Sequence, residues 1–245
     1  MSNMRNLRDW FPGRRHVVLP VIHVESQKQA LQNAELARQS GCDGVFLINH
    51  AIAVRDLLTI HQKVIEEFPG WWVGVNCLGI NPRQVFSIVG PGVAGVWTDD
   101  ACIDERTDVQ PAADAILAAR ASASWEGLYF GGVAFKYQRA VGDLAAAARL
   151  ATQYMDVVTT SGPGTGQAPS IAKIRAMKKA LGDCPLAIAS GITPENVADY
   201  LEVADCFLVA TGINASWTEL DPLLVRKLVQ TVESEGNQSG LKEPQ

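Results

Sequence analysis

The sequence predicts a single α/β domain built as a closed (βα)8 barrel. Short apolar, β-branched runs alternate eight times with longer helical patterns. The runs lack polar alternation, as is typical of parallel strands that are covered on both faces. The length of 245 residues also suits one barrel. An open, doubly wound sheet is the alternative, but eight evenly spaced units without a spare domain favour closure.

The strands are predicted from β-branched and aromatic runs, and the helices from their periodicity and end signals. Ser26 and Ser170 are typical N-caps, and Gly41 and Gly182 stand where glycine ends a helix. The predicted strands are Val17–His23, Gly44–Asn49, Trp72–Asn76, Ala94–Thr98, Gly127–Gly131, Asp156–Thr160, Leu186–Ala189 and Cys206–Ala210. The predicted helices are Ser26–Ser40, Ala53–Phe68, Pro82–Val89, Pro111–Ser122, Gly142–Gln153, Ser170–Leu181, Pro194–Leu201 and Pro222–Ser234.

Both ends of the chain differ from the barrel in composition. Residues 1–15 are expected to form an N-terminal arm, residues 16–234 the barrel, and residues 235–245 a polar, mobile tail. The aromatic pairs Trp10-Phe11 and Trp71-Trp72 fit an interface between copies of the chain, and they fit core packing equally well. A homo-oligomer is therefore one of two interpretations.

Composition and charge exclude several classes of protein. The chain is 47% hydrophobic and carries a net charge of −5, which argues against electrostatic binding of nucleic acid. Five scattered cysteines lack metal-ligand spacing and indicate reduced thiols, so we expect a cytoplasmic protein. No apolar run reaches the roughly 18 residues of a membrane span, and the N-terminus does not resemble a secretory signal.

Two glycine turns near the C-terminus predict a phosphate site. They follow the seventh and eighth predicted strands, and in a (βα)8 barrel the loops at these positions commonly bind phosphate. We expect the two turns to lie side by side, with Gly191 and Gly212 letting the backbone approach the ligand. The expected phosphate-binding residues are Ser190, Gly191, Ile192, Thr211, Gly212 and Ile213.

A third glycine-rich segment follows the sixth predicted strand. Its three glycines within six residues can present successive backbone N–H groups to an anion. The spacing does not match the motifs that bind nucleoside triphosphates or nicotinamide cofactors. The expected substrate loop comprises Ser161, Gly162, Gly164, Thr165 and Gly166.

Polar residues at the predicted carboxyl ends of the strands are the candidates for catalysis. Lys136 follows the fifth strand and is expected to stabilise negative charge, ahead of a Schiff-base role. Asp99 and Asp100 point opposite ways on a strand, so only one is expected at the barrel mouth, as a base or metal ligand. Taken singly, Asn49, His50 and Asn76 fit a cap or turn equally well. The candidates are His23, Glu25, Asn49, Asn76, Asp99 and Lys136.

No cofactor is required by this pattern. Oxygen ligands for Mg²⁺ are available at Glu25, Asp99, Asp100 and Asp104, but their spacing does not demand a metal.

Three segments of the chain resemble a known family. The runs from Asp156 to Gly166, from Ala189 to Val197 and from Ala204 to Thr211 are similar to the BtpA/SgcQ family. This resemblance implies a TIM barrel related to ribulose-phosphate-binding barrels such as phosphoribosylanthranilate isomerase. It implies phosphate binding more securely than isomerisation, and it supplies no reaction. The sequence departs from the family at the first strand and before Lys136, where the family tends to carry an acidic residue.

Three functional hypotheses follow. The first is an enzyme that acts on a small phosphosugar or phosphoribosyl compound, with isomerase, lyase and phosphoribosyl transferase chemistry all open. The second is a non-catalytic barrel that serves as a biogenesis or regulatory factor and keeps a residual phosphate site. The third is a Schiff-base aldolase, which requires a buried Lys136 facing the barrel axis. The expected partner is a phosphorylated small molecule.

Overall fold

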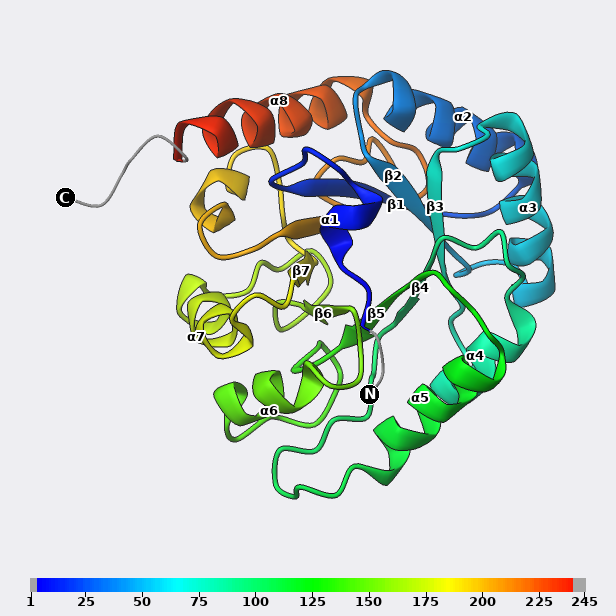
Figure 1. Cartoon of the computed structure of the whole chain (residues 1–245). Coiled ribbons are helices and arrows are strands. Elements are labelled where there is room, and N and C mark those ends of the chain that lie inside the picture. Colours follow the sequence, from blue (N-terminus) through cyan, green and yellow to red (C-terminus); the bar gives the residue numbers. More distant parts are fainter. Residues whose placement is uncertain (1–3, 240–245) are drawn as a thin grey trace.

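A computed structural model describes residues 4–239 and contains a closed barrel of eight parallel strands (Figure 1). The strands pair in chain order, and β1 closes the barrel by pairing with β8. They are β1 (Val17–His23), β2 (Gly44–Ile48), β3 (Trp72–Asn76), β4 (Gly95–Thr98), β5 (Leu128–Gly132), β6 (Val157–Thr160), β7 (Leu186–Ala189) and β8 (Cys206–Val209). The predicted fold class is confirmed.

Helices surround the barrel, as Figure 1 shows. They are α2 (Gln27–Gln39), α3 (Val54–Glu67), α4 (Pro82–Ile88), α5 (Pro111–Ser122), α6 (Leu144–Ala151), α7 (Ile171–Leu181) and α8 (Pro222–Ser239). The short helix α1 (Leu7–Trp10) precedes β1. Ser26 accepts a hydrogen bond from the Gln29 N–H, and Ser170 accepts one from the Lys173 N–H, so both predicted N-caps are present.

The barrel interior is filled by large aromatic side chains. Phe46 lies edge-on to Trp72, Trp97 and Phe130, with ring centroids 5.0–5.8 Å apart. Gly95 makes room for the Trp72 ring, because a Cβ there would lie 2.3 Å from the ring. Core packing inside the barrel therefore explains Trp72.

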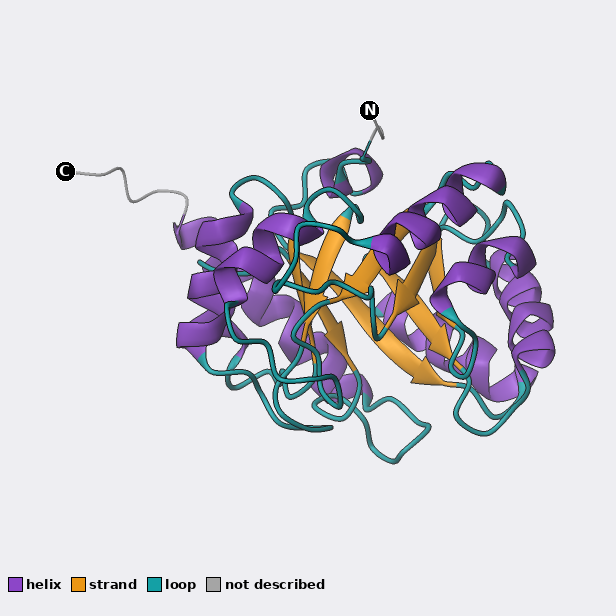
Figure 2. Cartoon of the chain, turned by 90° about the horizontal axis from the view of Figure 1, so that it is seen from below, coloured by secondary structure: helices purple, strands orange, loops and turns teal. Residues whose placement is uncertain are grey.

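The N-terminal arm packs over the amino end of the barrel. Leu7 and Phe11 are buried, and the Phe11 ring lies 5.6 Å from Trp72. The Arg5 N–H donates to the Asp156 carboxylate at 2.7 Å, and Arg120 forms a buried ion pair with the same residue. In Figure 2, α1 and the strand arrowheads lie at opposite ends of the barrel, which leaves the carboxyl ends of the strands open.

Two helical segments differ from the prediction by more than two residues at an end. The segment predicted as a helix over Pro194–Leu201 contains only a 3₁₀ turn, η1 (Val197–Tyr200). The Asn196 side chain accepts from the Thr193 N–H and donates to the Gly191 carbonyl, which favours a turn over a regular helix. Helix α8 continues to Ser239, beyond the predicted end at Ser234. Part of the predicted tail, residues 240–245, lies outside the described residues.

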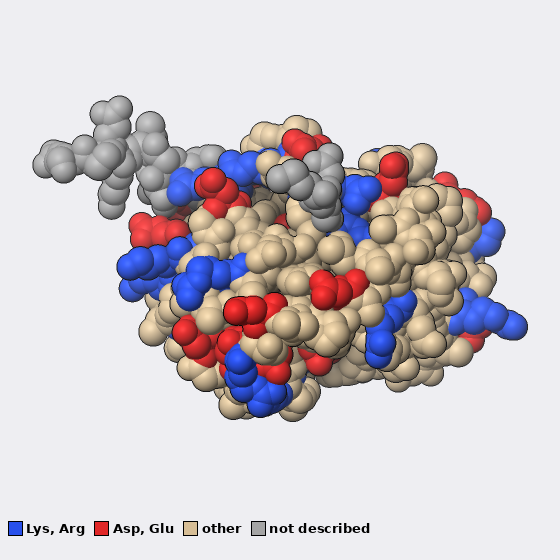
Figure 3. All heavy atoms as spheres, turned by 60° about the horizontal axis from the view of Figure 1, so that its bottom comes forward, with Lys and Arg blue, Asp and Glu red and all other residues tan. Residues whose placement is uncertain are grey.

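Figure 3 shows basic and acidic side chains interspersed over one face. All five cysteines are free, and three of them are buried. Within residues 4–239, no helix is long and apolar enough to cross a membrane.

Candidate functional site at the carboxyl ends of the strands

A cavity of about 150 Å³ opens at the carboxyl ends of the strands. Its inner wall is apolar and includes Val21, Ile48, Trp97 and Leu208. Its polar lining comes from the ends of seven strands or the loops after them: His23, His50, Asp99, Lys136, Thr165, Ser190 and Thr211. Sequence-distant polar groups thus meet on one cavity, as expected for this fold.

Lys136 reaches this cavity from the loop after β5. Its Nζ lies 3.3 Å from the Thr165 hydroxyl and 5.7 Å from the centre of the Phe135 ring. The residue is half-buried, and its backbone N–H donates to the Ser161 hydroxyl at 2.7 Å. The ammonium group is therefore presented at the cavity by a fixed backbone.

Asp99 and Asp100 point in different directions, as their adjacency predicts. Asp99 lines the cavity and accepts a hydrogen bond of 2.9 Å from the Asn76 side-chain amide. Burial raises the pKa of Asp99, while Asn76 and Lys136 act in the opposite direction. Asp100 instead accepts from the Cys102 N–H at 2.7 Å and stabilises the loop. Asn76 is fully buried, so it orients Asp99 from below the cavity.

Two histidines and a tryptophan form an aromatic cluster on the other side of the cavity. The His23 ring lies 4.8 Å from the His50 ring and 4.1 Å from the Trp217 ring. His23 Nδ1 is 2.9 Å from the Trp217 carbonyl oxygen, which only accepts, so Nδ1 carries the proton and Nε2 is an unprotonated base. Burial, reinforced by His50 and Lys136, lowers the pKa of His23 to about 4. His23 is therefore neutral at pH 7.

The loops after β6, β7 and β8 meet at the same cavity. Thr165 and Gly166 come from the first loop, Ser190 from the second and Thr211 from the third. The Ser190 hydroxyl donates to the Gly164 carbonyl at 3.0 Å, which joins the first two loops. Ser190 has a φ of +134°, a rare conformation for a residue with a side chain. Three loops thus bring the side chains of Thr165, Ser190 and Thr211 to the same cavity.

The two predicted turns lie side by side, but their glycines serve a different purpose from the one expected. A Cβ at Gly212 would lie 1.9 Å from the Ile192 carbonyl oxygen. A Cβ at Gly191 would lie 2.0 Å from the Ala168 nitrogen, and Gly191 also has a φ of +69°. The close approach that requires glycine is therefore between protein loops, where we had expected a ligand.

The backbone donors of these turns differ in availability. The Ile213 N–H donates to the Ala210 carbonyl at 2.9 Å, so it is already used within its turn. Over the described part of the chain, the N–H groups of Thr211 and Gly212 have no acceptor. Ile192 and Ile213 are buried, so their side chains belong to the core. Among the described residues the N–H groups of Gly191 and Ile192 likewise have no acceptor, so both turns have backbone donors available to an anion.

Two candidate catalytic residues lie away from the cavity. The Glu25 side chain is exposed and does not line the cavity. Asn49 is buried and holds the loop after β3, because its side-chain oxygen accepts from the Leu78 N–H at 2.8 Å. These placements do not support direct catalytic roles for Glu25 or Asn49.

The metal-binding alternative gains no geometric support. Asp104 is paired with Arg106 at 2.7 Å and with Arg139 at 3.3 Å. Among the residues described, no group of three or more His, Cys, Asp or Glu side chains is arranged to hold a metal ion.

The first part of the predicted substrate loop makes contacts within the protein. Ser161 is buried, and its hydroxyl donates to the Gly162 carbonyl at 2.8 Å. A Cβ at Gly162 would lie 1.9 Å from the Gln167 carbonyl oxygen, so this glycine allows the loop to fold on itself. A Cβ at Gly164 would lie 3.3 Å from the Gln167 side-chain nitrogen. Only Thr165 and Gly166 of this loop line the cavity.

Sequence reasoning missed Lys173 and Trp217. Lys173 lies in the first turn of α7, and its Nζ donates to the Ala134 and Ser161 carbonyls at 2.6 Å each. A lysine in the first turn of a helix is unfavourable, because the positive end of the helix dipole lies there. This unusual position is the feature of the sequence that could have indicated a special role for Lys173. Trp217 stands in a polar loop, and an isolated tryptophan in such a loop could have indicated a binding residue.

The fold and the cavity define a single-domain α/β barrel whose candidate site lies at the carboxyl ends of its strands. Residues 129–234 match the model of the BtpA family, which confirms the resemblance seen in the sequence. No curated protein matches the chain.

Solved structures share the fold at low sequence identity. Phosphoribosyl anthranilate isomerase from Thermus thermophilus is 15% identical, with a TM-score of 0.61 over 89% of this chain and 98% of that one. The tryptophan synthase α subunit from Legionella pneumophila is 14% identical, with a TM-score of 0.67 over 93% and 96%. (S)-3-O-geranylgeranylglyceryl phosphate synthase from Thermoplasma acidophilum, in complex with sn-glycerol-1-phosphate, is 16% identical, with a TM-score of 0.63 over 92% and 96%.

Proposed function

We propose that the protein is an enzyme that acts on a small phosphorylated sugar or phosphoribosyl compound. The observation that carries this proposal is the meeting of the loops after β6, β7 and β8 with Lys136 on one cavity. Solved barrels of the same fold include a synthase in complex with sn-glycerol-1-phosphate, which supports a phosphorylated ligand.

The proposed phosphate site combines one cation with neutral donors. Lys136 supplies the charge, the Thr165 and Thr211 hydroxyls line the same cavity, and the Thr211 and Gly212 N–H groups have no acceptor within the described chain. Charge-assisted hydrogen bonds and successive backbone donors are what a phosphate dianion requires. Ser190 completes the wall between Thr165 and Thr211.

The other side of the cavity supports proton transfer. Asp99 and the unprotonated Nε2 of His23 are candidate bases, and Lys136 can stabilise an anion that develops on the substrate. Isomerases and lyases that act on sugars need such a base and such a cation. We therefore favour these two classes over phosphoribosyl transfer. A non-catalytic biogenesis or regulatory barrel would not need three titratable groups on one cavity.

Calorimetry tests the phosphate site. Ribose 5-phosphate should bind to the full chain and unphosphorylated ribose should not. Thr211→Val removes a donor without changing the side-chain shape, and it should weaken ribose 5-phosphate binding by roughly three- to tenfold. The matched control is Thr59→Val, because Thr59 is exposed on α3 and donates to the Arg55 carbonyl.

Deuterium exchange tests the proposed proton abstraction. In deuterium oxide, an enzyme that abstracts a proton from a phosphosugar should introduce deuterium at carbon, which NMR detects. Asp99→Asn should abolish this exchange and retain binding. If ribose 5-phosphate and inorganic phosphate both fail to bind, the proposal is wrong. Binding without exchange or turnover across a phosphosugar panel would support the non-catalytic alternative.

A further inference from the structure

The loop between β8 and α8 is fixed over the cavity by buried amides of α2. The Thr218 carbonyl accepts from the side chains of Gln29 at 2.6 Å and Asn33 at 2.9 Å. The Leu220 N–H donates to the Asn33 oxygen at 2.9 Å. Gln29 and Asn33 are 7% and 2% exposed, so these bonds are shielded from water. Contacts within the protein therefore hold the loop in place.

This loop presents Trp217 at the cavity mouth. The ring packs against His23 and His50, with centroids 4.1 Å and 5.3 Å away. Nevertheless 51% of Trp217 remains exposed, and the residue lines the cavity. A large aromatic ring that is held in place and still exposed can stack on a ligand at little entropic cost.

A second exposed ring lines the same cavity. Tyr137 follows Lys136 and is 82% exposed. Its φ of +65° is a left-handed conformation that is rare for a bulky residue, and its hydroxyl lies 3.4 Å from the Thr165 hydroxyl. Burial does not account for this conformation, because the ring gains almost no packing within the chain. Strained residues of this kind gather at ligand sites.

The size of the cavity leaves part of a ligand outside. At about 150 Å³ it is smaller than the roughly 300 Å³ at which pockets begin to enclose whole ligands. A substrate anchored by its phosphate would therefore extend to the mouth, where Trp217 and Tyr137 are exposed. Two exposed aromatic rings at this position are best matched by a planar π-system on the part of the ligand that extends there.

We propose that the natural substrate is a phosphorylated sugar carrying a planar aromatic or heteroaromatic group that stacks on Trp217 and Tyr137. This inference rests on the proposed function, because the phosphate must enter the cavity for the attached ring to meet the two side chains. Trp217 is then a residue that determines specificity, with Gln29 and Asn33 positioning it.

Calorimetry with three probes tests the inference on the full chain. Adenosine and uridine 5′-monophosphates are ribose 5-phosphate with a planar base attached. At least one of them should bind roughly ten- to a hundredfold more tightly than ribose 5-phosphate itself, as expected for stacking on an aromatic side chain. Trp217→Ala should remove this advantage and change ribose 5-phosphate affinity by less than about twofold. Trp217→Phe should retain most of it.

Two further variants complete the test. Trp10→Ala is the matched control, since Trp10 is 38% exposed on α1 at the opposite end of the barrel. Tyr137→Ala tests the contribution of the second ring to nucleotide binding. It replaces Trp217→Ala in the experiment if that variant does not fold. Equal affinity for all three probes, or an equal loss for all three in Trp217→Ala, would overturn the inference and leave the phosphate proposal standing. Failure of inorganic phosphate, ribose 5-phosphate and both nucleotides to bind would remove both.

Discussion

Lys136 depends on contacts that lie outside the cavity. Its backbone N–H is held by the Ser161 hydroxyl, and the Lys173 ammonium binds the carbonyls of Ala134 and Ser161. Ala134 has a φ of +49°, so the chain before Lys136 turns through a conformation that needs such support. Burial lowers the pKa of Lys173 to about 8. A lysine on α7 thus fixes the backbone that presents the proposed charge-stabilising lysine.

Replacing Lys136 with methionine tests that charge. Lys136→Met keeps most of the side-chain bulk, so the free energy of unfolding should change by less than about 0.5 kcal/mol. Loss of a charge-assisted hydrogen bond should weaken ribose 5-phosphate binding by about tenfold or more, measured by calorimetry. Turnover of the natural substrate should fall by about two orders of magnitude or more, because the developing anion loses its counter-charge.

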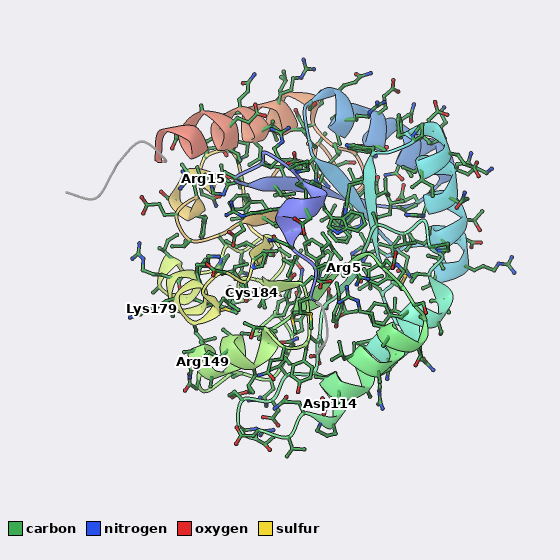
Figure 4. All side chains as sticks on the ribbon, viewed as in Figure 1. Arg5, Arg15, Asp114, Arg149, Lys179 and Cys184 are labelled. Carbon is green, nitrogen blue, oxygen red and sulfur yellow. The ribbon has the colours of Figure 1, made fainter. Side chains whose placement is uncertain are left out.

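Lys179→Met is the control for this change. Lys179 is an exposed lysine of α7 that points away from the barrel in Figure 4. Its replacement should leave phosphate affinity unchanged. Equal phosphate affinity in the Lys136 and Lys179 variants would contradict the proposed role. If borohydride traps a ligand covalently on Lys136, the Schiff-base alternative is correct.

At the scale of elements, the turns after β7 and β8 are interlocked through glycines. Gly191→Ala should destabilise the fold by about 3 kcal/mol or more, since it adds a clash with Ala168 to an unfavourable φ. Gly70→Ala is the control, because Gly70 has a φ of +78° with nothing within 4 Å, and only about 1–2 kcal/mol is expected. Chemical denaturation measures both. Equal effects would show that the conformation, and not the loop contact, requires glycine.

The sequence was sufficient to predict the strands, because buried parallel strands are short, β-branched and flanked by turn residues. Five strands differ from the prediction by one residue at one or both ends, and three agree at both ends. The segment after Pro194 was predicted less well. Its 3₁₀ turn depends on the Asn196 side chain reaching Thr193 and Gly191, and such local competition is not visible in apolar periodicity.

At the scale of the molecule, the barrel rule was sufficient to predict which strand ends face a common cavity. It brought together Lys136, Asp99 and Thr211, which lie far apart in the sequence. It could not place Trp217, because that residue is positioned by hydrogen bonds between α2 and the loop after β8. Nor could it separate glycines that admit a ligand from glycines that admit another loop, since both patterns look alike in one sequence.

The stability of the whole molecule should depend on pH through its histidines. Burial lowers the pKa of all four histidines in the folded state, that of His23 from 6.5 to about 4. Between these values the unfolded chain binds a proton that the folded chain does not, so stability is lost as pH falls from 6.5 toward 4. For His23 alone the full loss is about 3 kcal/mol. Burial raises the pKa of Asp43 and Asp99, which opposes the trend as pH falls through their raised folded-state pKa values.

Urea unfolding at pH 7.5, 6 and 5 measures this dependence. The free energy of unfolding should fall steadily over the series, and His23→Gln should reduce the fall, because glutamine does not titrate and can still donate toward the Trp217 carbonyl. His61→Gln is the matched comparison at a buried histidine outside the cavity, where Nε2 lies 3.2 Å from the Val73 carbonyl. A stability that is flat between pH 7.5 and 5 would contradict the neutral, buried state assigned to His23. So would an unchanged slope in His23→Gln, and the unprotonated Nε2 would then be unavailable as a base.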